Sequence, residues 1–290
     1  MKETVRIAFQ GEPGAFSESA ALAYEAAAET VPCATFEDVA EALAAGRADC
    51  AVLPVENSLA GGVVAAWDVL AGSAVSVIAE VVVPVRLGLL AVPGAALGQL
   101  REARSHPVAL AQCRLFLRSR PWLRPVAVHD TAGAAREVAH LADPGLAAIA
   151  SREAGARYGL DCLVADIQDR PDNQTRFFVL EQSPSVPASF SPDSLPAAAA
   201  SQPRPPLKTA LVAVTEDRPG ALRDLLSAFA DRGLDLAHIA SRPGGSPWTY
   251  AFVIEVRHHT TAELEDALAA ASGPGRSIRV LGTFPAATAG

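Results

Sequence analysis

The sequence is poor in aromatic residues and has no excess of positive charge. Phe, Trp and Tyr make up 6% of its 290 residues, and 32 acidic residues outnumber 24 basic ones, for a net charge of −8. A protein that holds a nucleic-acid backbone needs a basic surface, and single strands are usually bound by stacking on aromatic rings. The composition therefore predicts no nucleic-acid partner.

Cysteine motifs, a secretion signal and long apolar runs are also lacking. The four cysteines form no C-x-x-C motif, and we expect reduced thiols rather than disulfides. Charges at positions 2, 3 and 6 fall where a secretion signal would need an apolar stretch. Residues 87–100, the longest nearly uncharged run, are too few to cross a membrane. These absences predict a cytoplasmic protein with no membrane partner.

Common metal and nucleotide motifs are absent as well. The six histidines show no H-E-x-x-H or similar metal-binding spacing. No G-x-G-x-x-G follows the first predicted strand, and no G-x-x-x-x-G-K-[ST] occurs in the chain. We therefore expect no catalytic metal, and the case for a dinucleotide or a nucleoside triphosphate loses its main support.

The length suggests two domains, and a hydrophobic content of 50% with 19% charged residues is ordinary for a globular chain. Seven prolines and six serines fall in one stretch, Gln182–Leu207, whose composition is typical of an extended connector. We expect this connector to separate a first domain, Met1–Glu181, from a second, Lys208–Gly290.

In the first segment, short apolar runs typical of strands alternate with stretches whose apolar residues recur every three or four positions. The runs predict strands at residues 5–9, 50–55, 75–85, 87–92, 125–128, 146–150, 163–167 and 175–180. The other stretches predict helices at residues 17–28, 36–45, 110–120, 132–142 and 152–158. This alternation predicts an α/β fold with doubly wound layers, in one sheet or in two.

The second segment follows the order β-α-β-β-α-β. Strands are predicted at residues 208–215, 234–241, 250–256 and 278–284, and helices after Asp217 and over residues 261–271. The first of these helices has Pro219 in its first turn and ends at Gly233. The order is that of a ferredoxin-like split βαβ fold.

Small polar residues follow several predicted strands of the first segment, where helices begin. They occupy residues 11–17, 56–62, 130–133 and 151–153. In α/β folds ligands bind at the carboxyl ends of strands, and unpaired N–H groups at helix starts bind carboxylates or phosphates. Each loop taken alone could simply cap its helix. Together the loops predict a small anionic ligand.

A further polar group, Asn173–Phe177, stands at the entrance of the last strand of the first segment. Arg176 could bind a carboxylate through two N–H groups, or it could pair with a neighbouring acid such as Asp172. Thr175 could bind a ligand or be an ordinary strand threonine.

Six motifs stand in order along the chain: Ala8–Ala21, Leu53–Ser58, Ser105–Cys113, Asn173–Phe177, Arg218–Leu222 and Ser241–Pro243. Together they resemble the motifs of the prephenate dehydratases that carry a carboxyl-terminal ACT regulatory domain. The most specific is Asn173–Phe177, which matches the family's N-x-T-R-F signature. The resemblance implies an α/β catalytic domain of two lobes around a cleft, similar to periplasmic binding proteins, followed by a ferredoxin-like ACT domain.

The implied reaction converts prephenate to phenylpyruvate with loss of carbon dioxide and water, in phenylalanine biosynthesis. It needs no cofactor, because the formation of the aromatic ring drives it. Two alternatives remain open: an arogenate dehydratase, which acts on the amino-acid analogue, and a catalytically silent protein that binds an amino acid or another aromatic ligand.

The resemblance also implies residue roles. Thr175 would orient the departing hydroxyl or relay a proton to it, and the other catalytic candidates are Glu56, Asn57 and Gln112. An alcohol is a poor general acid by itself, so Glu56 would supply the proton if burial favours its protonated form. The candidates for substrate binding are Ser17, Ser58, Arg176 and Phe177.

In such ACT domains two segments meet at a subunit interface and enclose phenylalanine, a feedback inhibitor. Here the matching allosteric residues are Gly220, Ala221, Leu222, Ser241, Arg242 and Pro243. Ala240 stands where the family usually has glutamate. Either this change alters the response to phenylalanine, or the change is tolerated and the response is intact. We expect a homodimer or homotetramer formed partly by residues 234–256.

Overall fold

The computed structural model describes residues 4–183, 206–244, 249–273 and 275–287. Most of the predicted connector, residues 184–205, lies outside the described residues. The chain divides into two compact units, one of residues 1–64 and 81–177 and one of residues 65–80 and 178–290. Residues 65–80 therefore pack with the carboxyl-terminal part of the chain.

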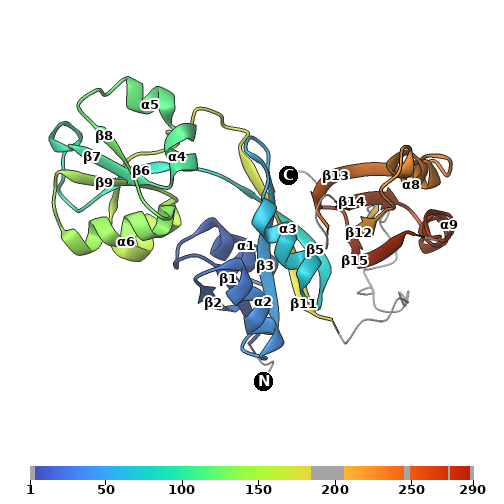
Figure 1. The fold of residues 1–290 in the computed structure, drawn as a ribbon. Coiled ribbons are helices and arrows are strands. Elements are labelled where there is room, and N and C mark those ends of the chain that lie inside the picture. Colours follow the sequence, from blue (N-terminus) through green and yellow to red (C-terminus); the bar gives the residue numbers. More distant parts are fainter. Residues whose placement is uncertain (1–3, 184–205, 245–248, 274, 288–290) are drawn as a thin grey trace. The chain divides into compact units, whose positions relative to one another are not determined.

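The first sheet has the strand order β2-β1-β3-β11-β5, and the short strand β4 pairs with β3. β1 pairs in parallel with both β2 and β3, as expected of doubly wound layers. Helices α1 (Phe16–Tyr24) and α2 (Phe36–Ala44) connect these strands (Figure 1). The strands are β1 (Arg6–Gln10), β2 (Glu29–Cys33), β3 (Cys50–Asn57), β4 (Gly61–Gly62), β5 (Val75–Pro84) and β11 (Gln174–Gln182).

A second sheet, separate from the first, has the order β10-β6-β9-β7-β8. Its strands are β6 (Gly88–Ala91), β7 (Glu102–Ser105), β8 (Arg124–Ala127), β9 (Leu146–Ala150) and β10 (Asp161–Val164). Its helices are α4 (Pro107–Gln112), α5 (Arg114–Arg118), α6 (Thr131–Leu141) and α7 (Arg152–Tyr158), besides a 3-10 turn at Leu97–Gln99. Two sheets confirm the expectation of two α/β lobes, here called the first lobe and the second lobe.

The central strand β9 shows why the second lobe forms a sheet covered on both faces. All five of its residues are buried. Ala147 and Ile149 pack into one apolar cluster, with Leu87 and Leu123, while Ala148 and Ala150 pack into another, with α6 and α7. Alternate side chains of a strand point to opposite faces, so a run without polar residues suits a strand that is buried on both sides.

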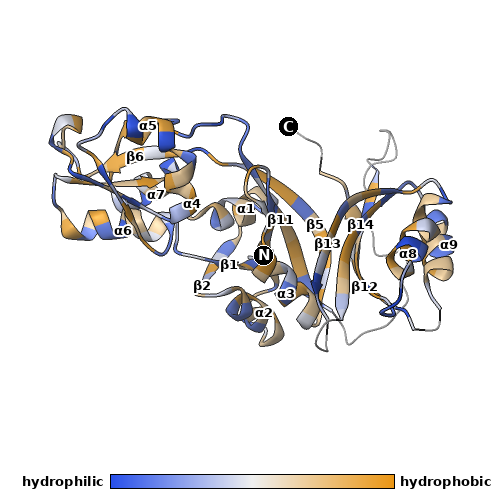
Figure 2. Ribbon diagram, turned by 45° about the horizontal axis from the view of Figure 1, so that its top comes forward, coloured by the Kyte–Doolittle hydropathy of each residue, from blue (hydrophilic) through white to orange (hydrophobic). Residues whose placement is uncertain are grey.

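The third sheet is antiparallel, in the order β13-β14-β12-β15. Its strands are β12 (Leu207–Val214), β13 (Asp235–Pro243), β14 (Tyr250–His258) and β15 (Ser277–Pro285). Helices α8 (Ala221–Ala230) and α9 (Thr261–Ala271) cover one face, with Leu225, Phe229 and Leu264 in the shared core (Figure 1). Hydrophobic residues dominate β14 and hydrophilic ones the outside of α8 (Figure 2). The predicted β-α-β-β-α-β fold is confirmed.

Helix α3 (Val64–Gly72) was not predicted from the sequence. Its apolar residues lie on both sides of the helix rather than on one stripe: Trp67 and Leu70 are buried, whereas Val64 is exposed. Trp67 stacks on His238 of β13 with ring centroids 5.4 Å apart and meets the edge of Phe178 at the same distance. Arg279 of β15 donates hydrogen bonds to three carbonyls at the end of α3, those of Leu70, Ala71 and Ser73.

Several predicted boundaries were wrong. The helix expected at 110–120 is two short helices separated at Cys113, whose backbone is not helical. The strand expected at 163–167 lies at Asp161–Val164, and the helix expected to run to residue 28 ends at Tyr24. Strands β2 and β7 were missed because they contain Pro32, Glu102 and Arg104 in place of a regular apolar run. Within the described ranges, no helix is long and apolar enough to cross a membrane.

Candidate active site

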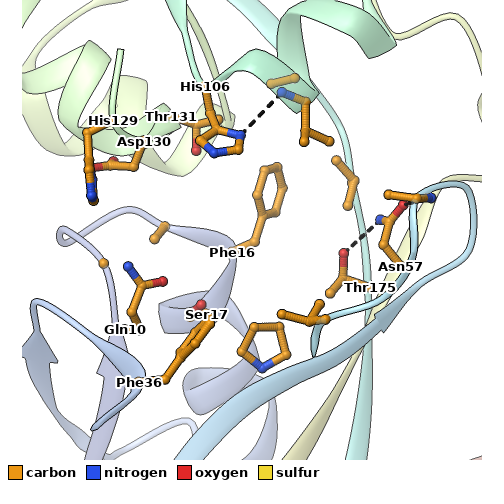
Figure 3. Close-up of a pocket in the computed structure, with 18 of the residues that line it drawn as sticks. Gln10, Phe16, Ser17, Phe36, Asn57, His106, His129, Asp130, Thr131 and Thr175 are labelled. Carbon is orange, nitrogen blue, oxygen red and sulfur yellow. Dashed lines mark hydrogen bonds and ion pairs between the residues drawn. The ribbon is translucent and has the colours of Figure 1, made fainter. Parts of the chain in front are cut away.

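A pocket of about 630 Å³ in the first unit is lined by both lobes (Figure 3). It lies where strands end: Gln10 is the last residue of β1, Asn57 the last of β3, and His106 directly follows β7. This is where an α/β fold is expected to bind a ligand. Its polar lining residues are Gln10, Ser17, Thr35, Glu37, Asn57 and Thr175 from the first lobe, and His106, Gln112, His129, Asp130 and Thr131 from the second.

The side-chain amide of Asn57 is held in one orientation. Its Oδ1 accepts hydrogen bonds from the backbone N–H groups of Leu59 (3.1 Å) and Ala60 (2.9 Å). Its Nδ2 therefore faces the start of β11, where its two hydrogens are shared among Asn173 Oδ1 (2.8 Å), Thr175 Oγ1 (3.0 Å) and the carbonyl oxygen of Gln174 (3.1 Å). Two accepted N–H bonds decide which end of the amide is oxygen, so Asn57 donates to Thr175.

This hydrogen bond determines what the Thr175 hydroxyl can do. Thr175 lines the pocket, and Figure 3 shows its hydroxyl beside Asn57. Since Oγ1 accepts from Asn57 and no described residue accepts its hydrogen, the O–H group can donate to a ligand. A hydroxyl at the entrance of β11 is thereby oriented as a donor into the pocket.

Glu56 and Arg176 lie on the opposite face of their strands, outside the pocket. Successive residues of a strand point to opposite faces, so the neighbours of Asn57 and Thr175 face away from them. Glu56 Oε2 lies 2.8 Å from Arg176 Nη2, and neither residue lines the pocket. Of the two alternatives for Arg176, the structure shows an ion pair, and its partner is Glu56 across β3 and β11 rather than Asp172. Asp172 pairs instead with Arg170, at 2.6 Å.

Of the four other candidate residues, two line the pocket and two do not. Ser17 and Gln112 line the pocket, at the start of α1 and the end of α4. Ser58 does not: its hydroxyl accepts a hydrogen bond from Gln174 N at 3.0 Å and ties the loop after β3 to β11. Phe177 is buried, 1% exposed, and packs with Ala20 and Val83 beneath α1.

His106 was noticed in the sequence only as part of a motif. Its Nδ1 accepts a hydrogen bond from Val108 N at 3.2 Å and so caps helix α4. In the neutral ring the hydrogen then sits on Nε2, which can donate within the pocket that His106 lines (Figure 3). The S-H-P spacing was the available signal, because a residue that caps a helix directly precedes Pro at its first position.

The pocket has features that suit anions without any lysine or arginine. Among the described residues that line it there is none of either type. The first turns of α1 and α6 reach the pocket at Phe16, Ser17 and Thr131, and the N–H groups of a first turn attract negative charge. Phe16 and Phe36 add two aromatic rings. The described residues include no group of His, Cys, Asp or Glu placed to hold a metal ion.

The predicted allosteric residues lie in the second unit. Gly220 caps α8 with a φ of +85°, a left-handed conformation that favours glycine, and Ala221 and Leu222 begin the helix against its core. Ser241–Pro243 form the end of β13. The Arg242 guanidinium donates to both oxygens of Asp68 on α3, at 2.6 Å each from Nη2.

Comparison with known proteins places these features in one family. The family model for prephenate dehydratase matches residues 7–185, and the model for the ACT domain matches residues 209–273. The chain belongs to the prephenate dehydratase family. The resemblance carried by the six motifs is therefore confirmed, and the chain is a dehydratase, a hydro-lyase, of this family with a carboxyl-terminal ACT domain.

Two curated relatives are 37% and 40% identical to this prephenate dehydratase family member over the aligned residues. Arogenate dehydratase/prephenate dehydratase 2 of Arabidopsis thaliana is 37% identical over 98% of this chain and 74% of its own length. Arogenate dehydratase 2 of Petunia hybrida is 40% identical over 82% of this chain and 57% of its own. The chain thus spans little more than half the length of some of its relatives.

Two solved structures are similar over nearly the whole chain. One is a prephenate dehydratase from Arthrobacter aurescens in complex with L-Phe, with a TM-score of 0.83, 33% identity and coverage of 98% of this chain and 93% of that one. The other is GqqA, described as a novel type of quorum quenching acylase, with a TM-score of 0.85, 33% identity and coverage of 97% and 98%.

Proposed function

We propose that this protein converts prephenate to phenylpyruvate, carbon dioxide and water, under control by L-phenylalanine. The observation that carries the proposal is the Thr175 hydroxyl, oriented by Asn57 as a donor into the pocket. It belongs to the stretch Asn173–Phe177 that resembles the family signature.

The chemistry requires a proton and a place for two carboxylates. As the ring carboxylate leaves as carbon dioxide, its bonding electrons enter the ring and expel the hydroxyl, which must take up one proton to leave as water. Thr175 donates a hydrogen bond to that oxygen and relays a proton that comes from solvent, since a threonine hydroxyl is too weak an acid to be its source. Asn57 holds Thr175 in position.

Substrate binding is assigned to neutral groups. The N–H groups at the starts of α1, near Ser17, and α6, near Thr131, with the amide of Gln112, are placed to hold the carboxylates. Phe16 and Phe36 offer apolar contact to the ring that becomes aromatic. Glu56, Arg176 and Ser58 link β3 to β11, and Phe177 packs beneath α1, instead of touching the substrate. Since Glu56 does not line the pocket, the proposed proton source is not Glu56.

The assay of purified protein decides among the alternatives. We expect phenylpyruvate from prephenate, in excess of phenylalanine from arogenate, which carries an amine where prephenate has a keto group. A preference for arogenate would support the function named for several plant relatives. If the protein turned over neither substrate but still bound a ligand, the result would support the alternative of a catalytically silent binding protein.

A third assay offers an acylated quorum-sensing signal, because GqqA is described as an acylase. Acyl transfer to a side chain needs a hydroxyl or thiol next to a base. Among the described residues, no hydroxyl that lines the pocket is hydrogen-bonded to His106 or His129. We expect no acylase activity at this pocket.

The effector proposal rests on the ACT domain and on the L-Phe complex of the Arthrobacter aurescens protein. Ile239 and Tyr250, 44% and 51% exposed, lie on β13 and β14, which we propose contact a second copy of the chain. Light scattering should give the mass of a dimer or tetramer, and a monomer at working concentration would contradict the pairing.

We propose that the contact between Arg242 and Asp68 carries the effect of bound phenylalanine to the catalytic residues. Arg242 belongs to the effector motif, and Asp68 lies on α3, which follows directly after the pocket residues Gly61–Val63. Asp68→Asn should leave the rate without phenylalanine unchanged and raise the phenylalanine concentration for half-inhibition about tenfold. Asp235→Asn, which alters an exposed pair with Arg257, is the control. Equal inhibition of both variants and the parent would exclude this path.

A further inference from the structure

The loop between β1 and α1 contributes to the pocket at several points. Gly11 and Ala15 of the loop line it, as do Phe16 and Ser17 at the start of α1. In the sequence this loop suggested only an anion site or a helix cap. In the structure it also contacts the second lobe, through residues that do not themselves line the pocket.

Two hydroxyl groups of helix α7 hold the loop. Ser151 Oγ donates to the carbonyl of Gly14 at 2.9 Å and, at the same time, accepts from Ala154 N at 3.0 Å, which caps α7. At the other end of α7, Tyr158 Oη donates to the carbonyl of Pro13 at 2.7 Å. The loop of the first lobe is therefore bound at two successive carbonyls by one helix of the second lobe.

The approach is close enough to require glycine. Gly14 has a φ of +95°, and a Cβ placed on it would lie 2.8 Å from Ala154 Cα, a backbone atom that cannot move without moving α7. On the other side, Gly14 N donates to Glu18 Oε2 at 2.6 Å, and Glu18 is only 5% exposed. Gly14 is thus enclosed between α1 and α7.

We propose that Gly14, Ser151 and Tyr158 are positioning residues of the reaction, which together form a lobe contact that sets the distance across the pocket. The proposal rests on the proposed function. Thr175 and Ser17 belong to the first lobe, whereas Gln112 and Thr131 belong to the second. A substrate with two carboxylates and a leaving hydroxyl meets all of them only at one separation of the lobes.

Gly14→Ala tests the contact, with Gly46→Ala as its matched control. Gly46 also has a positive φ, +66°, but a Cβ placed on it would meet no heavy atom within 4 Å beyond its chain neighbours, so alanine there strains the backbone less and meets no collision. Since a displacement of about 1 Å can cost about a hundredfold, we expect kcat/KM for prephenate to fall about a hundredfold in Gly14→Ala. Gly46→Ala should stay close to the parent.

The separate changes in kcat and KM distinguish a loss of positioning from a loss of stability. A smaller folded fraction would lower the apparent kcat and leave KM unchanged, whereas a displaced Ser17 raises KM as well. Tyr158→Phe removes one hydrogen bond and keeps the ring, so it should show a smaller change of the same kind. Gly14→Ala with the kinetics of Gly46→Ala would overturn the proposal.

Hydrogen exchange gives a readout that needs no activity. Gly14→Ala should lose protection in residues 11–17 and also in residues 151–158, and Gly46→Ala should lose it in neither. Unchanged protection in Gly14→Ala would overturn the lobe contact. If the parent turned over neither prephenate nor arogenate, the proposed function would fail, while coupled loss of protection would still establish the contact.

Discussion

Thr175→Val should lower kcat for prephenate by about a thousandfold and change KM little, within the range found for positioned proton donors. Valine keeps the shape and the strand preference of threonine and removes only the hydroxyl that Asn57 orients. Steady-state rates of phenylpyruvate formation measure the effect.

Thr175→Ser is the matched variant for this prediction. It restores the hydroxyl on a less restricted side chain and should recover most of the rate, because Asn57 still donates to the oxygen. If Thr175→Val kept the activity of the parent, the donor role of Thr175 would be abandoned. A loss shared equally by the serine variant would point to packing instead.

The second large effect concerns stability. Lys208→Met should lower the free energy of unfolding by about 3–5 kcal/mol, the usual cost of removing one partner of a buried ion pair. Lys208 Nζ lies 2.9 and 3.0 Å from the two oxygens of Glu80 and 3.9 Å from Glu255 Oε2. The side chains of Glu80 and Glu255 are 1% and 0% exposed. The variant thus removes the positive charge that two buried carboxylates contact.

Tryptophan fluorescence measures this unfolding in urea, since Trp67, one of the three tryptophans, packs in the same unit against Phe178. Arg257→Met is the control, because Arg257 and Asp235 form an exposed pair worth about 0–1 kcal/mol. Adding Glu80→Met to Lys208→Met should recover part of the loss, since the pair is then replaced by apolar atoms. Equal midpoints for the two single variants would contradict the prediction.

Elements whose signals are local could be predicted well. Helix α9 begins and ends as predicted, at Thr261–Ala271, because Thr260 and Glu263 form a capping box, a pattern of residues close together in the chain. Strand β9 likewise has the predicted bounds, Leu146–Ala150, since its apolar run is continuous. Helix α3 could not be found in this way, because its apolar residues are shared among neighbours that come from distant parts of the chain.

The residues of the candidate site could likewise be predicted only in part. Its motifs identified Thr175, Asn57, Gln112 and Ser17, all of which line the pocket. The motifs also contained Glu56 and Arg176, and nothing in the order of residues says which side chains of a strand face a ligand. The pairing of β3 with β11 decides this, since it places Asn57 beside Thr175 and Glu56 beside Arg176.

By itself the sequence determined the α/β and β-α-β-β-α-β classes, the family and the segments that carry the pocket, because periodicity, caps and motifs are properties of neighbouring residues. Only the tertiary structure decided which residues of those segments share the pocket, that Arg242 contacts Asp68, and that Gly14 meets α7. These contacts join residues more than a hundred positions apart. Their geometry depends on how whole elements pack, which no local pattern records.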